Sequence, residues 1–327
     1  MRSTAAHIFA RAAALLLLSA ACMLPATAQD WPARPIRIIV PFAPGGSADV
    51  FGRALAQHLQ GVLGQNVVID NRPGGGSLIG TDAVAKSAPD GYTLLLMSNT
   101  HTVNESLIPS KPFALLRDFA PIAPISYSDL VLVTKPDLPH KTLPDLIKAA
   151  KSRPGSMSYA SSGPGTPYHM AGELFKSMAR ISLVHIPYRG SAGARTDVIG
   201  GQLEMMFDAI PTMTEQIKAG KVRALATTGR SRSAILPDVP TMDEAGVKGY
   251  DAVLWLGLMA PKGTPPAVIA RLNAELSKYT SSAEVKRSWS AQGATPMTMG
   301  VDEFTRYVEG DIAKWAQVVK VSGAKAE

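Results

Sequence analysis

The sequence predicts an α/β fold made of two lobes with a ligand cleft between them, and three observations support this prediction. Short β-branched runs alternate with helical patterns along most of the chain, which indicates βαβ units and a mostly parallel sheet. Two apolar segments with spaced prolines, 123–139 and 249–266, interrupt the alternation and are expected to cross between the lobes. The 327 residues, 46% of them hydrophobic, favour two domains over one.

The first 28 residues have the features of a secretory signal peptide. Arg2 and Arg11 accompany the apolar run "AAALLLLSAACML", and "ATA" at 26–28 supplies a small-residue cleavage site, so the mature chain is expected to begin at Gln29. A membrane anchor and a lipidated Cys22 are the alternatives. Cys22 is the only cysteine, so removal of the signal leaves no residue for a disulfide or a thiolate metal site.

Each predicted strand after the signal is followed by a predicted helix or turn. In chain order, the predicted strands are 36–42, 66–76, 92–98, 156–162, 182–188 and 203–210. The predicted helices are 48–59, 77–88, 168–179, 192–201 and 211–220, each after the strand that precedes it in the chain. Because the two crossing segments divide this series, residues 29–127 plus 254–327 are expected to form one lobe and residues 128–253 the other.

The turn "PGGSAD" after the first strand has the composition of an anion site. Gly45 and Gly46 allow positive φ and a close approach of another group. Ser47 can cap the following helix or face a ligand, and Asp49 suits the positive helix end. A tight structural turn explains the same residues equally well.

Two later turns repeat this design. Ser161 and Ser162 end a strand, Thr166 is placed to cap the next helix, and Pro167 occupies its first position. A third turn, 188–191, has the sequence Tyr-Arg-Gly-Ser at another strand-to-helix junction. If the lobes face each other, each contributes a turn whose N–H groups and hydroxyls can bind an anion. This arrangement fits a ligand with a carboxylate.

Catalytic, metal and nucleic-acid motifs are missing from the sequence. It has no GxSxG elbow, no phosphate loop and no dinucleotide fingerprint, its six histidines show no metal-ligand spacing, and its basic residues are scattered despite a net charge of +7. No cofactor or metal is therefore expected, and no enzyme. His169 and Asp208 either face the ligand or pack and cap helices, Trp255 either lines the cleft or packs the hinge, and Arg53 and Arg72 can pair with Asp49 and Asp70.

The whole chain resembles the solute receptors of tripartite tricarboxylate transporter systems, the Bug family of extracytoplasmic binding proteins. Motifs that carry the resemblance run through nearly the whole mature chain. They are "WPARPIRIIVPFAPGGSADVFGR", "VVIDNRPGGGSLIGTDAVAKSAPDGYTLL", "RDFAPI", "YASSGPGTPYHMAGELF", "HIPYRGSAGARTDVIGGQLEMMFD", "LPDVPTMDEAG" and "WLGLMAPKGTPP". The resemblance implies a two-lobed periplasmic-binding-protein fold, type II-like, that closes on its ligand.

The resemblance also implies how the ligand carboxylate is held, namely by backbone N–H groups and small hydroxyls of the turns. Carried over to this chain, the implied contacts are Phe42, Gly45, Gly46, Ser47 and Asp49 from one lobe and Ser161, Ser162, Gly163, Gly165, Thr166, His169, Gly190 and Asp208 from the other. The segment "SNTHTVN" commonly lies near the pocket in the family, which adds Ser98 and His101. The chain has Phe51-Gly52-Arg53 and Gly165-Thr166 where the family often has Ala-Arg and Gly-Ser, so the ligand's identity stays open.

The expected function is that of a periplasmic, monomeric receptor that captures a small carboxylate and delivers it to membrane permease subunits. A di- or tricarboxylate, an amino acid or an aromatic acid is compatible with neutral donor turns. A sensing subunit that signals to a regulatory partner is the alternative, and an enzyme on the same scaffold is a third possibility.

Overall fold

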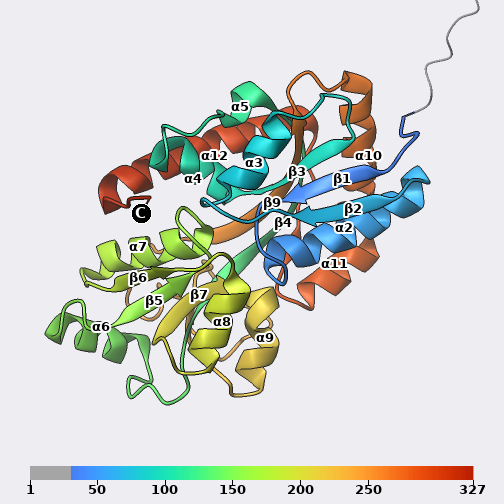
Figure 1. Cartoon of the computed structure of the whole chain (residues 1–327). Helices are drawn as coiled ribbons and strands as arrows, with labels where there is room; N and C mark the ends of the chain where they lie inside the picture. Colours follow the sequence, from blue (N-terminus) through green and yellow to red (C-terminus); the bar gives the residue numbers. More distant parts are fainter. Residues whose placement is uncertain (1–30, 327) are drawn as a thin grey trace, which may run out of the picture. The chain divides into compact units, whose positions relative to one another are not determined.

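Ten strands form one mixed sheet in the computed structural model, which describes residues 31–326 (Figure 1). The expected signal peptide, its cleavage site and Cys22 lie outside the described residues. The strands are β1 (Ile36–Val40), β2 (Val67–Asn71), β3 (Thr93–Ser98), β4 (Phe119–Thr134), β5 (Ser158–Ser161), β6 (Val184–Pro187), β7 (Met205–Ala209), β8 (Arg223–Thr227), β9 (Val253–Pro261) and β10 (Thr295–Pro296).

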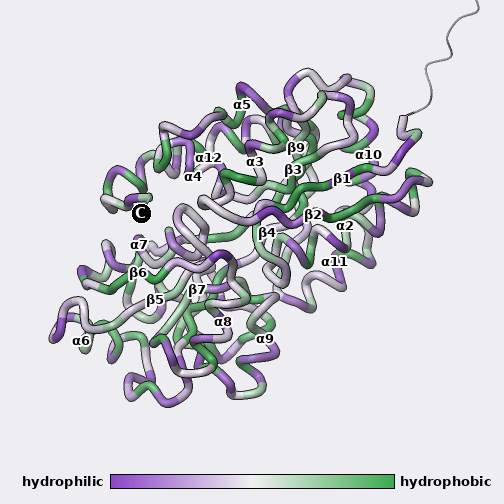
Figure 2. The backbone as a smooth tube through the Cα atoms, in the orientation of Figure 1, coloured by the Kyte–Doolittle hydropathy of each residue, from purple (hydrophilic) through white to green (hydrophobic). Residues whose placement is uncertain are grey.

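The first half of the sheet has the order β2-β1-β3-β9-β4. β1 pairs in parallel with β2 and β3, as the βαβ pattern predicts, and β9 runs antiparallel to both β3 and β4. Apolar residues make up most of β1 and β3, as the colouring of Figure 2 shows, and four of the five residues of β1 are buried. A strand that is hydrophobic on both faces is typical of a parallel sheet covered on both sides.

The second half continues from β4 in the order β4-β7-β5-β6, with β8 also paired to β4. β5 pairs in parallel with β6 and β7, whereas β7 and β8 run antiparallel to β4. The prediction of a mostly parallel sheet is therefore wrong for the middle. The reason is that the two crossing segments are themselves long strands, β4 and β9, and they pair with each other.

The helices follow the predicted positions where a prediction was made. They are α2 (Ser47–Leu63), α3 (Leu78–Ala85), α4 (Asn99–Leu107), α5 (Leu115–Asp118), α6 (Leu143–Ser152), α7 (Pro167–Ala179), α8 (Ser191–Ile199), α9 (Ile210–Lys218), α10 (Pro266–Ser281), α11 (Ala283–Ser290) and α12 (Val301–Ser322).

Helix α2 shows how local sequence sets these bounds. It begins after Gly46, buries Phe51, Leu55 and Leu59 on one face at a spacing of four residues, and ends at Gly64. Gly64 has φ of 68°, and its N–H donates to the Gln60 carbonyl, which is a glycine C-cap. The amphipathic pattern, rather than helix propensity alone, places α2 on the sheet.

The C-terminal helix α12 brings together the elements on both sides of the β4 crossing. Its Trp315 is buried in a small apolar cluster with Val103 and Leu107 of α4 and Met170 of α7. Trp255 of β9 is also fully buried, and it packs against Phe304 and Tyr307 of α12. Trp255 therefore belongs to the core rather than to the cavity wall described below.

Of the described residues, 34–326 form one compact unit by their contacts. The lobe boundaries expected at residues 127–128 and 253–254 lie inside β4 and at the start of β9, and they stay a prediction. Among the helices of the described residues, none is both long and apolar enough to cross a membrane.

Candidate functional site

A narrow cavity lies where the N-termini of four helices meet. The helices are α2, α4, α7 and α8, and each begins directly after a strand or its turn. The residues that line the cavity are Phe42, Ala43, Gly46, Ser47, Ala48, Ser98, Thr100, Ser162, Thr166, Pro167, Tyr168, Gly190, Ser191, Leu254 and Leu256. Both halves of the sheet therefore contribute to one wall.

The electrostatics of this cavity come from backbone dipoles. Its lining, within the part of the chain that the structure describes, includes no lysine, arginine, histidine, aspartate or glutamate. The first N–H groups of a helix have no carbonyl partner within it, and they carry its positive partial charge. Four such helix ends around one space favour a negatively charged group without any cationic side chain.

Helix α2 supplies two such N–H groups. The N–H groups of Asp49 and Val50 both donate to the Gly46 carbonyl, so Ser47 and Ala48 precede the first intrahelical bonds. The Ser47 hydroxyl is buried in the wall and has no well-formed hydrogen bond among the described residues, although it lies near the Tyr168 hydroxyl. Ser47 is thus a donor that the protein itself leaves largely unused.

Asp49 holds the shape of the first turn from behind the cavity wall. Its Oδ2 accepts hydrogen bonds from the Gly45 N–H and from Arg53 Nε, each at 3.1 Å, and Arg53 Nη2 forms an ion pair with Oδ1 at 2.9 Å. Burial acts to raise the pKa of Asp49, but the hydrogen bonds from Arg53, Gly45 and Asn71 outweigh it and lower the pKa. Asn71 also donates to the Phe42 carbonyl at 3.1 Å, so this network ties both ends of the turn.

Helix α4 contributes Ser98 and Thr100 to the wall, whereas His101 points into the protein. The Thr81 hydroxyl donates to the Ser77 carbonyl at 2.8 Å, so His101 Nε2–H donates to Thr81 Oγ1 at 2.9 Å. His101 Nδ1 then accepts the Ser98 N–H at 3.2 Å and completes a capping box. Burial lowers the pKa of His101 to about 4, so it is neutral. Both ring nitrogens are used within the chain.

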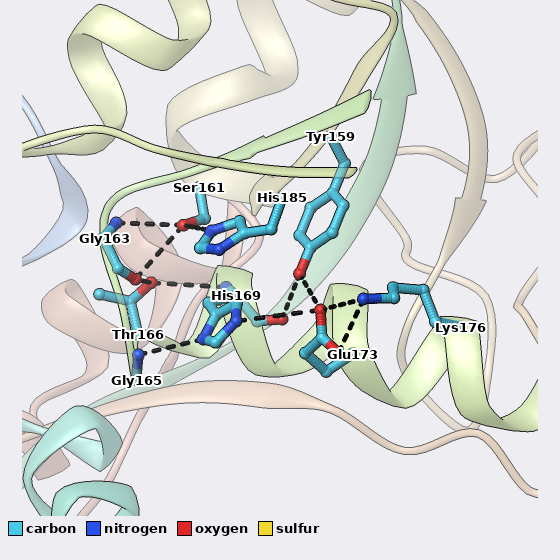
Figure 3. Close-up of polar contacts among 9 residues, drawn as sticks. All are labelled: Tyr159, Ser161, Gly163, Gly165, Thr166, His169, Glu173, Lys176 and His185. Carbon is cyan, nitrogen blue, oxygen red and sulfur yellow. Dashed lines mark hydrogen bonds and ion pairs between the residues drawn. The ribbon is translucent and has the colours of Figure 1, made fainter. Parts of the chain in front are cut away.

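The second turn, Ser161–Thr166, is held by hydrogen bonds within the chain (Figure 3). The Thr166 hydroxyl donates to the Gly163 carbonyl at 2.7 Å and accepts the His169 N–H at 3.4 Å. The Gly165 N–H donates to His169 Nδ1 at 3.1 Å. Gly163 and Gly165 have φ of 125° and 71°, a region that favours glycine. The prediction that Thr166 caps α7 is confirmed.

Asp208 is fully buried and is satisfied by its own chain. Arg195 of α8 donates two hydrogen bonds to Oδ2 at 2.8 and 3.0 Å, and the Ala209 N–H and Thr212 hydroxyl donate to Oδ1. Burial raises the pKa of Asp208 even though Arg195 opposes the rise. Burial, with Asp208 nearby, also keeps the Tyr168 pKa far above its usual value, so that hydroxyl stays protonated. The Asp208–Arg195 pair anchors α8, whose first residues line the cavity.

The first and third turns approach each other so closely that only small residues fit. A Cβ atom added to Gly190 would lie 2.6 Å from the Ala43 Cβ, and one added to Gly46 would lie 3.1 Å from the Ser191 Oγ. Gly190 is extended at φ of 170°, so any residue could adopt its backbone conformation. The glycine is needed here for space rather than for conformation.

A second, larger cavity adjoins the narrow one. The narrow cavity has a volume of about 30 Å³, whereas the second has about 420 Å³. They share the lining residues Phe42, Ser162 and Thr166. The rest of the second wall includes glycines 74–76, Ser77, Gly163, Pro164, Tyr188 and Arg189. Ser77 is buried, with an Oγ that has no hydrogen-bond partner among the described residues.

The structure divides the fifteen predicted site residues into two groups. Those that line the narrow cavity are Phe42, Gly46, Ser47, Ser98, Ser162, Thr166 and Gly190, and Gly163 lines the larger one. Those that line neither cavity are Gly45, Asp49, His101, Ser161, Gly165, His169 and Asp208. Members of the second group form or support the turns, and their expected contact with the ligand stays a prediction.

Sequence reasoning missed several residues of the wall. Leu254 and Leu256 alternate on one face of β9, which only the pairing of β9 brings next to the turns. Thr100 is the second residue of α4, and Tyr168 directly follows the predicted Pro167. A search for residues within the first turn of each predicted helix would have found Ala48 and Tyr168, whereas no helix was predicted at Thr100.

Comparisons with known proteins agree on one family. Residues 51–324 match the model of the tripartite tricarboxylate transporter family receptor. The chain is 42% identical to the protein BugT of Bordetella pertussis over 95% of this chain and 96% of that protein.

Solved structures show the same fold. The periplasmic binding protein BugD is 33% identical, with a TM-score of 0.85, over 91% of this chain and all of that one. An R. palustris protein solved with adipate is also 33% identical, with a TM-score of 0.88, over 90% of this chain and 99% of that one. The predicted periplasmic-binding-protein fold is thus confirmed, and this family and fold are those of solute-binding receptors.

Removal of the Asp208 charge should destabilise the protein strongly. Asp208→Asn leaves the largely buried Arg195 without its carboxylate, which typically costs about 3–5 kcal/mol of unfolding free energy. Urea unfolding would measure this loss. Glu275→Gln, at the exposed pair with Lys278, is the control and should cost less than about 1 kcal/mol. The double change Asp208→Leu with Arg195→Met should recover much of the lost unfolding free energy. If Asp208→Asn lost no more unfolding free energy than the control, the pair would not anchor α8.

Gly190→Ala should separate the first turn from the start of α8. The added methyl group would overlap Ala43, and overpacking of this kind costs about 1–3 kcal/mol. Hydrogen exchange measured by mass spectrometry should be faster in peptides that cover 40–50 and 186–195. Gly61→Ala, whose added Cβ would meet nothing within 4 Å, is the matched control and should leave both peptides unchanged. Unchanged exchange in Gly190→Ala would refute the close approach.

Proposed function

Because the chain belongs to the tripartite tricarboxylate transporter receptor family, we propose that it is a periplasmic receptor that captures a small carboxylate and delivers it to a membrane transporter of that class. The observation that carries this proposal is the convergence of four helix N-termini on a cavity with no charged side chain in its described lining. Backbone N–H groups and the Ser47 hydroxyl would hold the carboxylate.

The two adjoining cavities support a dicarboxylate as the ligand. A water-sized group needs about 10–15 Å³, so the narrow cavity of about 30 Å³ matches the two oxygens of one carboxylate. The larger cavity would take the rest of the molecule, and the exposed guanidinium of Arg189 in its wall is suited to a second carboxylate. Adipate, the compound in the R. palustris structure, has this chemistry.

Capture by closure is the mechanism that we propose. Residues from both halves of the sheet line the narrow cavity, so a ligand there would contact both only when the turns lie together. Ligand binding would then shift the population towards the closed form. β4 and β9 would act as the hinge between the lobes 29–127 plus 254–327 and 128–253, and the closed form would be the one that docks to the permease.

A thermal-unfolding panel tests the proposed function. Mature protein that has been unfolded, dialysed and refolded would be scanned with mono-, di- and tricarboxylates and with the matching amides. A ligand present at about 100 times its Kd adds roughly 2.7 kcal/mol of stability, which raises Tm by several degrees. Stabilisation by acids but not by amides is expected. No shift with any acid would contradict the proposal.

Ser47→Ala sharpens this test. The Ser47 hydroxyl has no well-formed bond to lose in the ligand-free protein, so the unfolding free energy should change little. A hydrogen bond to a charged ligand contributes about 1.5–3 kcal/mol, so affinity should fall about 10- to 150-fold by calorimetry. Ser156→Ala, an exposed serine outside both cavities, is the control. Undiminished affinity in Ser47→Ala would remove the hydroxyl from the binding site.

Arg189→Gln should reduce the preference for two-ended ligands. Loss of an exposed charge–charge contact should weaken dicarboxylates about two- to tenfold and leave monocarboxylates unchanged. Calorimetric titration of a matched pair, such as adipate and hexanoate, measures the difference. Arg153→Gln, outside both cavities, is the control. An equal loss for both ligands would show that Arg189 does not meet the second carboxylate.

A further inference from the structure

Two stacked histidines lie behind the second turn and not in the cavity wall (Figure 3). The rings of His169 on α7 and His185 on β6 have centroids 4.1 Å apart and are nearly parallel at 21°. The Tyr159 ring also stacks with His185, with ring centroids 5.0 Å apart and planes at 26°. His169 is buried, with 3% of its surface exposed, and the three rings pack together behind the second turn.

Each histidine bonds one end of the turn. His169 Nδ1 accepts the Gly165 N–H at 3.1 Å, and His185 Nε2 lies 2.7 Å from the Ser161 Oγ. The Ser161 Oγ in turn accepts the Gly163 N–H at 3.1 Å. Ser162 and Gly163, which line the cavities, lie between these two attachment points. The shape of the wall therefore depends on both imidazoles.

The bond from Gly165 fixes the protonation state of His169. A backbone N–H can only donate, so Nδ1 must carry a lone pair, and the ring is the neutral tautomer with its proton on Nε2. A protonated ring has N–H groups at both positions and cannot accept this bond. Two cationic rings stacked at 4.1 Å would also repel each other.

The Glu173 carboxylate acts to raise the pKa of His185, but burial and nearby positive charge outweigh it. Glu173 of α7 lies 3.9 Å from His169 Nε2, but it is already bonded by Lys176 at 2.7 and 2.9 Å and by the Tyr159 hydroxyl of β5. A separate cavity of about 320 Å³ borders the pair, and the end of the chain adds Lys325 to its wall. Burial, together with nearby positive charge, lowers the pKa of His169 to about 4 and that of His185 to about 3.

We propose that His169 and His185 are positioning residues that hold the second turn in its binding shape only while both rings are neutral, and that protonation releases the turn. The consequence for ligand affinity rests on the proposed function. The consequence for the turn does not, because the hydrogen bonds are those of the chain alone.

Amide hydrogen exchange of the isotope-labelled mature protein tests the device without any ligand. Protection of the Gly163 and Gly165 amides, corrected for intrinsic rates, should fall when the pH is lowered from 6 to 3.5. The Gly45 amide, which donates to Asp49, serves as the reference for how the first turn responds to the same change in pH. His169→Asn places a non-titrating oxygen at the position of Nδ1, so the fall at Gly165 should disappear. His169→Leu offers no acceptor, so protection there should be low at every pH.

Ligand affinity adds a second measurement. With a pKa of about 4, half of His169 is protonated at pH 4, so wild-type affinity for adipate relative to His169→Asn should fall about twofold there and stay level at pH 7. Protonation of adipate affects both proteins equally, so it cancels in the ratio of their two affinities. Circular dichroism at each pH checks that both remain folded.

The outcomes separate the two proposals. Exchange at Gly165 that is independent of pH, or the same pH dependence in wild type and His169→Asn, would overturn the positioning role. If exchange behaves as expected but no carboxylate binds at pH 7, the positioning role stands and the proposed function fails.

Discussion

The structure depends on one constraint: several helix N-termini must point at the same small space. Parallel strands make this possible because their carboxyl ends, and the helices that follow, lie at one edge of a sheet. Helices α2, α4, α7 and α8 follow β1, β3, β5 and β6, two in each half of the sheet. Their unpaired N–H groups would be costly to bury without a partner, so the same geometry that builds the fold favours an anionic ligand.

Charged side chains surround this space without entering it. Asp49 with Arg53 frames the first turn and Asp208 with Arg195 anchors α8, while the neutral histidine pair supports the second turn. Each charge is neutralised within the protein, so the field in the cavity comes from fixed backbone dipoles. A ligand held in this way would make no ion pair in the narrow cavity, and its binding would depend on the exact positions of turns rather than on flexible cations.

Local sequence predicted the turns and most of the elements near them, because glycine, serine and proline act within a few residues. Thr166 caps α7 as expected, and the bounds of α2 follow its apolar face. The pairing of Arg53 with Asp49 was among the expectations, but the partners of His101, His169 and Asp208 could not be predicted. A buried polar residue has the same identity in the sequence whether its side chain contacts a ligand or other residues of the chain. Only its hydrogen-bond partners in the structure distinguish the two cases. The antiparallel centre was also missed, since it depends on pairings between distant residues.

The antiparallel pairing of β3 with β9 has a consequence for biosynthesis. Leu95 pairs with Met259, so the edge of β3 stays unpaired until residues 253–261 have been synthesised and have reached it. Contacts of such large sequence separation slow folding, because loop closure must precede them. The N-terminal half of this chain therefore cannot complete its own sheet early, and an incomplete chain with an open strand edge would need protection from aggregation.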